Sequence, residues 1–231
     1  MNNYSVSEKL LHRLTLGNAI IPSVSFDIES ALYQNKIPKN LTDNKHLFIT
    51  GYARSGTTAL VKIFHETNKY NSLTYEDMPF VLAPNFWKKA SPKKEKTKLL
   101  QRIHNDGIFI NSESPEAFDE VFWKVFLKNN YIKSDRLTIN TIPADVLKKY
   151  AQFINFALLK YYEGETIRYL SKNNNNILRI DALKNLFPQT DFIITLRDPL
   201  QHAQSLLNQH KLFSKVHQDD PFALEYMNWL G

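Results

Sequence analysis

The stretch 46–60 constrains the fold of this chain more than any other part of its sequence. It begins with the apolar run 47–49, which is typical of a buried strand. Gly51 and Gly56 then enclose a loop of four residues, and apolar side chains recur at helical spacing in 59–64. The stretch therefore predicts a strand, a tight turn and the start of a helix.

The predicted turn suits an anion. Backbone N–H groups of such a loop and of the first helical turn point into one concave site, where the helix dipole also favours negative charge. Arg54 adds a positive charge, and the hydroxyls of Ser55, Thr57 and Thr58 add hydrogen-bond donors. Gly56 is followed by threonine, where the nucleotide-triphosphate loop has lysine. We therefore expect an anion that needs no metal ion; a turn that binds nothing is the alternative.

The segment 52–60, Tyr-Ala-Arg-Ser-Gly-Thr-Thr-Ala-Leu, resembles the 5′-phosphosulfate loop of sulfotransferases that use 3′-phosphoadenosine 5′-phosphosulfate (PAPS). A second segment, 192–199, again reads as strand, turn and helix start. Arg197 ends this strand and Ser205 follows eight residues later, which resembles the motif that holds the 3′-phosphate of the same donor. An arginine suits that task because its planar fork pairs with two phosphate oxygens. A salt bridge from Arg197 to Asp198 is the alternative.

The resemblance covers about residues 45–210 and implies both a fold and an activity. The fold is α/β, a three-layer sandwich with a central parallel sheet and a P-loop-like strand-loop-helix. We expect one domain over 1–231, with a helical lead-in over 1–44. Family members commonly end in a further strand and a basic, glycine-containing loop over the 3′-phosphate. We expect that C-terminal part to be missing, because 228–231 ends the chain without either.

The implied reaction transfers a sulfuryl group from PAPS to a hydroxyl or amine of a glycan, a lipid or a small molecule, and releases PAP. By position, the resemblance assigns the 5′-phosphosulfate and the 3′-phosphate to separate residue sets. The first set is Arg54, Ser55, Gly56, Thr57 and Thr58, and the second is Arg197 and Ser205.

The reaction also needs a base to accept the proton of the acceptor. In several branches of the family this is a glutamate just after the second strand, and Glu76 occupies a similar place after the predicted strand 71–75. We predict that Glu76 is the catalytic base and that Arg54, the second catalytic residue, stabilises the charge on the leaving phosphate. Asp77 is the second candidate, and His104 and Glu113 are more remote. Because an ordinary glutamate is a weak base, burial would have to raise its pKa; a loop carboxylate paired with a lysine is the alternative.

Elsewhere, hydrophobic periodicity predicts strands that alternate with helices, which favours a parallel sheet. The predicted strands are 46–50, 71–75, 177–180 and 191–196. The predicted helices are 7–16 with Leu10, Leu11 and Leu14 on one face, 26–36, 57–67, 114–126 capped by Ser114, 143–170 with a break near 163–164 as the alternative, and 199–210 capped by Asp198. Glu120, beside the apolar stripe of its helix, is expected at the surface.

Composition limits the remaining function classes. The chain has 231 residues without cysteine, which excludes disulfides, thiolate metal sites and a cysteine nucleophile. A net charge of +6 suits a polyanionic ligand. Six lysines fall in 84–98 without an alternating aromatic platform, so we predict a solvated surface and no nucleic-acid partner. Without a signal pattern or an apolar span, a cytoplasmic enzyme is expected, with no metal site.

Three alternatives stay open at this point. The first is a metal-dependent P-loop nucleotide kinase or NTPase, against which the missing loop lysine counts. The second is a non-catalytic nucleic-acid-binding protein, suggested only by charge. The third is a related fold that binds PAP without turnover.

Overall fold

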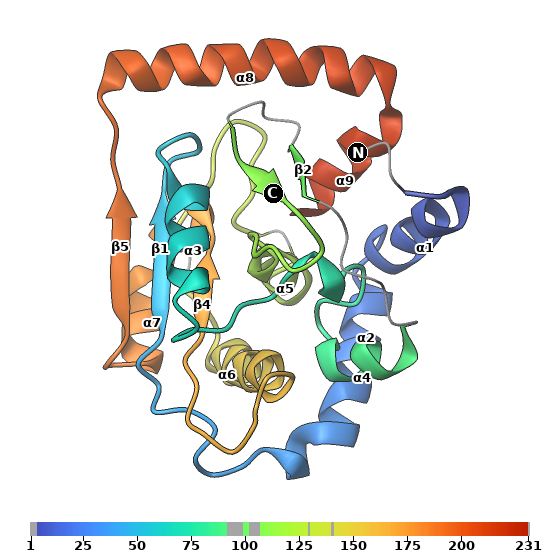
Figure 1. The fold of residues 1–231 in the computed structure, drawn as a ribbon, viewed down its shortest axis with the longest axis vertical. Helices are drawn as coiled ribbons and strands as arrows, with labels where there is room; N and C mark the ends of the chain where they lie inside the picture. Colours follow the sequence, from blue (N-terminus) through green and yellow to red (C-terminus); the bar gives the residue numbers. More distant parts are fainter. Residues whose placement is uncertain (1–3, 92–98, 102–106, 129, 140, 231) are drawn as a thin grey trace.

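A parallel sheet of three strands forms the centre of the protein (Figure 1). The computed structural model describes residues 4–91, 99–101, 107–128, 130–139 and 141–230. Within them the strand order is β4-β1-β5, and Leu47 of the central strand lies opposite Leu170 and Asp191. The bounds are β1 (Leu47–Gly51), β4 (Leu170–Lys172) and β5 (Asp191–Thr195). The predicted α/β class with a central parallel sheet is confirmed.

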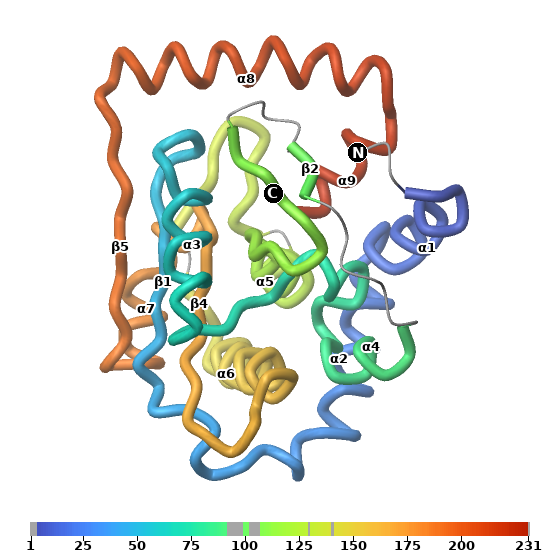
Figure 2. Tube along the Cα trace, viewed as in Figure 1, coloured from blue at the N-terminus to red at the C-terminus, as the bar shows by residue number. Residues whose placement is uncertain are grey.

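Helices make up most of the remaining described chain, and Figure 2 follows its path. The α-helices are α1 (Val6–Leu16), α2 (Ile20–Tyr33), α3 (Thr57–Glu66), α4 (Pro84–Ala90), α5 (Asp119–Phe126), α6 (Ala144–Leu159), α7 (Ile180–Leu186), α8 (Pro199–Asp219) and α9 (Pro221–Leu230). Shorter elements are the 3₁₀ turns η1 (Gln34–Lys36), η2 (Tyr75–Asp77) and η3 (Asn174–Leu178), and an antiparallel pair of strands, β2 (Leu100–Gln101) and β3 (Phe109–Ile110).

The central strand is buried on both faces, which explains its continuous apolar sequence. Leu47 and Ile49 belong to a small cluster with Val61 of α3. Phe48 points to the other face and joins the main core, which includes Phe153 of α6 and Leu183 of α7. Because successive strand residues face opposite sides, this alternation places helices over both faces of the sheet and confirms the three-layer arrangement.

Two predicted strands are wrong. In 71–75 only isolated bridges form, from Asn71 to Tyr169 and from Thr74 to Pro115. The segment leaves the sheet because Thr74 and Asp77 make a reciprocal capping box that starts the turn η2. The other predicted strand, 177–180, is taken up by η3 and the start of α7.

The third strand of the sheet, β4, lies at the end of a segment predicted as helix. Helix α6 ends at Leu159, and Gly164 has a φ of +103°, which a helix does not accommodate. The chain then returns alongside β1, where Leu170 is completely buried. Tertiary pairing with β1 therefore overrides the local helical pattern.

Several helix details also differ from the prediction. Helix α5 begins at Asp119, because the Ser114 hydroxyl bonds the backbone N–H and the side chain of Asn111 instead of capping a helix. In α1 the side chains of Leu10 and Leu14 are exposed, so the predicted apolar face is wrong at these two positions, whereas Leu11 is partly buried. Helix α8 is longer than predicted, none of its residues is buried, and it runs from the end of β5 to α9 (Figure 1).

Candidate active site

The three strands of the sheet end at one edge, as carboxyl ends of parallel strands do. Gly51, the last residue of β1, pairs with Thr195 of β5, and Lys172 ends β4. Gly51 has a φ of +142°, and a Cβ there would lie 2.4 Å from the Thr195 hydroxyl oxygen. Only glycine permits this close approach, so the predicted turn begins where β1 and β5 touch.

The loop 52–56 is held in a defined shape by local hydrogen bonds. The Ser55 hydroxyl donates to the carbonyl of Tyr52 at 2.6 Å and also bonds the Thr195 hydroxyl. Arg54 and Gly56 both adopt positive φ angles, +69° and +100°. Gly56 is the N-cap residue of α3 and has no side chain to satisfy the first-turn N–H groups. The N-terminal end of α3, where the helix dipole favours negative charge, therefore lies next to this loop without a side-chain cap from Gly56.

The two predicted nucleotide motifs meet in space. Arg54 donates from Nε to the hydroxyl of Ser205 at 3.2 Å, and Arg197 donates from Nη1 to the carbonyl of Arg54 at 3.2 Å. His202, which the sequence analysis did not single out, donates from Nε2 to the carbonyl of Ala53 at 2.7 Å. Asp198 caps α8 as predicted, accepting from the N–H of Gln201 at 3.0 Å.

A cavity of about 2060 Å³ opens beside this junction. Pockets for single small ligands are roughly 300–1,000 Å³, so the space exceeds what one nucleotide needs. The polar part of its lining includes residues 54–58, Arg197 and Lys172, and apolar side chains of α8 and α9 such as Phe213 and Met227 also line it. Ser205 is not a lining residue and acts on this cavity through Arg54.

Glu76 lines the same cavity from the turn η2. Its side chain is 39% exposed, its Oε1 accepts from the Ser112 hydroxyl at 3.4 Å, and its Oε2 lies 4.0 Å from Nζ of Lys160. Both backbone polar groups of Glu76 are hydrogen-bonded. Its N–H donates to the Ser112 carbonyl at 2.9 Å, and its carbonyl accepts from the indole of Trp87 at 3.0 Å. The predicted base therefore faces the cavity but is only half-buried.

The other candidate bases are placed less well. Asp77 is buried, bonds Lys160 at 2.8 Å and accepts from the N–H of Thr74, so its carboxylate is committed to the fold. Glu113 is not among the residues that line the cavity. His104 lies outside the described residues, as do residues 92–98 of the lysine-rich segment.

Two polar residues that the sequence analysis overlooked line the polar part of the cavity. Lys172, at the end of β4, is 10% exposed at its side chain and forms an ion pair with Glu116. Asn174 accepts a hydrogen bond from the Thr57 hydroxyl at 3.3 Å, while its carbonyl accepts from Thr50 at 2.9 Å. A lysine before four asparagines was the available signal, but it was missed because no strand was predicted between the helix that was expected to end near residue 170 and the loop 173–176.

Behind these residues lies a buried ion pair. Glu120, predicted at the surface, is 1% exposed and bonds Arg179 at 3.0 Å. Burial raises the pKa of Glu120, but the charge of Arg179 and the hydrogen bonds from Arg179, Tyr131 and Asn173 together outweigh it, so the pKa is lowered. Asn173 donates to the same carboxylate at 2.7 Å, which fixes the residue between Lys172 and Asn174. The prediction for Glu120 is therefore wrong, because α5 faces the sheet at this point.

The described part of the chain lacks two kinds of feature. No group of three or more histidine or acidic side chains there has the arrangement of a metal site. No helix in those ranges combines the length and the apolar character needed to cross a bilayer.

Comparison with known proteins identifies the class. The family model described as "Sulfotransferase family" matches residues 46–226, well over half of the chain, and the match includes both nucleotide motifs and Glu76. The protein belongs to the sulfotransferase family. A search of curated proteins finds no match.

A solved sulfotransferase structure has a similar fold. The sulfotransferase STF9 from Mycobacterium avium superposes with a TM-score of 0.57 at 15% identity, covering 94% of this chain and 58% of that one. The sulfotransferase STF1 from Mycobacterium tuberculosis H37Rv gives a TM-score of 0.43 at 15% identity, covering 84% of this chain and 56% of that one. The chain thus spans a little over half the length of these solved structures.

Proposed function

We propose that the protein transfers a sulfuryl group from PAPS to a hydroxyl or amine of a glycan, lipid or small-molecule acceptor. The observation that carries this proposal is the contact of Arg54 with both Ser205 and Arg197 at the carboxyl edge of the sheet. A donor with phosphate groups at its 5′ and 3′ positions needs two neighbouring anion sites, because both groups are attached to the same ribose. Inorganic phosphate or AMP, which carries a single phosphate group, needs only one anion site.

The residues present fit this donor. The 5′-phosphosulfate would be held by the loop and the start of α3, through Arg54, the hydroxyls of Ser55, Thr57 and Thr58, and the uncapped N–H groups after Gly56. A Cβ on Gly56 would meet nothing within 4 Å, so the ligand side of the loop is open. The 3′-phosphate would be held by Arg197, and Ser205 would contribute by holding the side chain of Arg54 beside it. The donor supplies a sulfuryl group already activated by its bond to phosphate.

The protein's own part in the reaction is positioning, proton transfer and charge stabilisation. Glu76 would accept the acceptor's proton as its oxygen or nitrogen attacks sulfur. Arg54 and the α3 N–H groups would stabilise the charge that develops on the phosphate side. Lys172 is well placed to assist, because its ammonium group reaches the same cavity from the neighbouring strand.

Calorimetric titration with PAP, AMP and ATP in the absence of magnesium tests the donor assignment. We expect PAP to bind more tightly than AMP, because only PAP offers a 3′-phosphate to Arg197. Equal affinities would refute that assignment. Magnesium-dependent ATP turnover would favour the kinase or NTPase alternative, and PAP binding without sulfuryl transfer to any acceptor would indicate a non-catalytic binder.

A further inference from the structure

We propose that the acceptor is amphipathic. Its hydroxyl or amine reacts beside Glu76, and its aliphatic body packs on apolar side chains that α8, α9 and the β2–β3 pair present to the same cavity. This inference rests on the proposed function and narrows the acceptor to a lipid-like alcohol or amine. In the reaction the acceptor oxygen or nitrogen bonds to sulfur, the bond from sulfur to the donor phosphate breaks, Glu76 takes the proton and PAP leaves.

The first step of the argument is the size of the cavity. Its volume is about 2060 Å³, whereas a pocket for one small ligand is roughly 300–1,000 Å³. The residues proposed to touch the donor, 54–58 and Arg197, are a minority of the residues that line it. The cavity therefore has room for a second, sizeable molecule beside the donor.

The second step is the pattern of the two helices that border this cavity. Each turns one face toward it, with apolar side chains three or four residues apart. These lining residues are Phe213 and Val216 in α8, and Ala223, Met227 and Leu230 in α9. An apolar helix face normally packs on the core of a protein. Here two such faces border a cavity, which favours an apolar ligand.

The third step is that α9 is fixed in this position. Phe222 of α9 is buried in the main core, which anchors the helix through its other side. Glu225 accepts two hydrogen bonds from Arg13 of α1, the shorter at 2.7 Å, and Asp220 lies 3.7 Å from Nζ of Lys9 in α1. Figure 1 shows α9 next to α1. The fold itself therefore holds the apolar face of α9 toward the cavity.

The fourth step is the apolar surface that two short strand pairings add. Leu100 of β2 pairs with Ile110 of β3, and Ile132 forms an isolated bridge with Leu137. All four line the cavity, yet Leu100 is 47% exposed, Leu137 42% and Ile132 36%. Large apolar side chains that stay this accessible around one cavity are typical of a ligand-binding site. Together with the faces of α8 and α9 they form an apolar wall.

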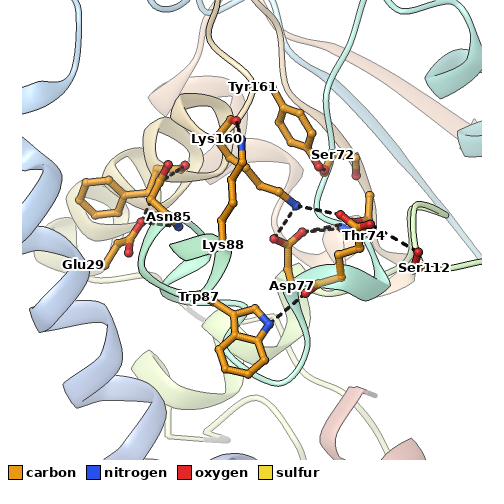
Figure 3. A network of polar contacts seen from close by, with 12 residues as sticks. Glu29, Ser72, Thr74, Asp77, Asn85, Trp87, Lys88, Ser112, Lys160 and Tyr161 are labelled. Carbon is orange, nitrogen blue, oxygen red and sulfur yellow. Dashed lines mark hydrogen bonds and ion pairs between the residues drawn. The ribbon is translucent and has the colours of Figure 1, made fainter. Parts of the chain in front are cut away.

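The fifth step joins the apolar wall to the proposed base. Ser112, two residues after Ile110, accepts the backbone N–H of Glu76 at 2.9 Å and donates from its hydroxyl to the Glu76 carboxylate at 3.4 Å. The indole of Trp87, which also lines the cavity, donates to the Glu76 carbonyl at 3.0 Å (Figure 3). An acceptor whose aliphatic part contacts Ile110 therefore has its polar end close to Glu76.

Two other occupants of this space are alternatives that the experiment must separate. One is a glycan acceptor, because polar side chains such as Gln101, Gln209 and Asn228 also line the cavity. The other is a further polypeptide segment packed on the apolar wall. An aliphatic acceptor differs from both, since each methylene group that it buries adds to its affinity.

The test measures the binding of hexan-1-ol, octan-1-ol and decan-1-ol to the full chain by calorimetry with PAP present, and sulfate transfer from PAPS to the same alcohols. We expect the dissociation constant to fall by roughly 5- to 15-fold for each added pair of methylene groups. The upper value corresponds to complete burial at about 0.8 kcal/mol per group. Hexane-1,6-diol and methyl β-glucoside should bind more weakly than hexan-1-ol.

Variants of the apolar wall locate the binding. Met227→Gln places an amide on the α9 face and should weaken octan-1-ol binding by roughly 5- to 20-fold, with PAP affinity unchanged. Leu137→Gln should act in the same way, and its half-exposed position keeps the test decisive if Met227→Gln does not fold. Leu14→Gln is the matched control, because Leu14 is 54% exposed and does not line the cavity.

Four outcomes decide the matter. Absence of alcohol binding, or affinity that does not rise with chain length, would overturn the proposal, and so would equal losses in the control and the wall variants. Sulfate transfer to methyl β-glucoside in preference to the alcohols would also overturn it while leaving the proposed function in place. Tight alcohol binding that depends on the apolar wall, without sulfate transfer to any acceptor, would instead refute the proposed function and support the apolar site.

Discussion

At the scale of single residues, Arg54 links the two predicted nucleotide motifs. Its backbone has a φ of +69°, which is uncommon for a residue with a side chain. In this conformation its carbonyl accepts from Arg197 while its guanidinium donates to Ser205. The loop and the start of α8 are therefore set relative to each other before any ligand binds.

The first prediction concerns the choice of nucleotide. Arg197→Ala should remove most of the preference for PAP over AMP, a loss of about 10-fold to 100-fold in PAP affinity, because a charged hydrogen bond to phosphate is lost. Affinity for AMP should change much less. Calorimetry on both nucleotides measures the effect. Arg168→Ala is the control, since Arg168 pairs with Asp43 at the opposite end of the sheet; a similar loss in that variant would contradict the assignment.

The second prediction separates Glu76 from its neighbour. Glu76→Gln should lower turnover by roughly 10²–10⁴-fold and leave PAP affinity and stability nearly unchanged, because it removes a base but keeps the shape. Asp77→Asn should instead lower the free energy of unfolding by about 3–5 kcal/mol, since it leaves Lys160 buried without its anion. Sulfate-transfer assays and urea unfolding on both variants provide the measurements. Normal turnover in Glu76→Gln would remove Glu76 from the mechanism.

At the scale of elements, β1 is tied to its neighbours by more than ladder bonds. His46, which precedes the strand, is 1% exposed, and its Nδ1 accepts from the N–H of Tyr169. Its carbonyl accepts from the N–H of Asp191 at 3.0 Å. One residue therefore helps to set the position of β1 between β4 and β5. Burial lowers the pKa of His46 to about 4.

The third prediction follows from this shifted pKa. The imidazole of His46 binds a proton more readily in the unfolded chain than in the folded one. The contribution of neutral His46 to stability is therefore complete above pH 6.5 and is lost as the pH falls towards 4. Between pH 7 and pH 5 the unmodified protein should lose about 2 kcal/mol more stability than His46→Asn, which keeps an acceptor for Tyr169. Urea unfolding at both pH values measures this. His210→Asn is the control, because the side chain of His210 is exposed. If the free energy of unfolding depends on pH equally in His46→Asn and in the unmodified protein, the prediction is contradicted.

At the scale of the whole molecule, the helical layer and the sheet edge are joined by the ion pair of Glu120 with Arg179. Glu120 lies in α5, Arg179 precedes α7, and Asn173 follows β4. The guanidinium also lies 4.8 Å from the ring centre of Trp123 in the main core. The pair therefore connects the core to the segment that lines the proposed donor site.

The fourth prediction tests this connection. Arg179→Met should lower the free energy of unfolding by about 3–5 kcal/mol, because it leaves the Glu120 carboxylate buried and unpaired. Adding Glu120→Gln should recover a large part of that loss. Arg136→Met is the control, since that arginine pairs with Asp135 at the surface and should cost less than about 1 kcal/mol. Equal losses in the Arg179 and Arg136 variants would show that the buried pair does not join the layers.

The sequence by itself determined the parts whose signals are local. The strand-turn-helix around Gly51 and Gly56 and the junction at Asp198 were predicted in place, because glycine conformations, caps and apolar runs act within a few residues. The same local signals led to the family. They failed for β4, whose strand conformation comes from pairing with β1 and not from its own sequence pattern.

Only the tertiary structure decided which distant side chains meet. The bonds of Arg54 to Ser205 and of Lys160 to Asp77 join residues far apart in the sequence, and no periodicity encodes them. The buried state of Glu120 likewise depends on which face of α5 packs on the sheet. The charge of a residue, known from the sequence, indicates whether that residue on its own prefers water or the protein interior. Its neighbours in the fold decide whether a carboxylate is buried in an ion pair or faces a cavity.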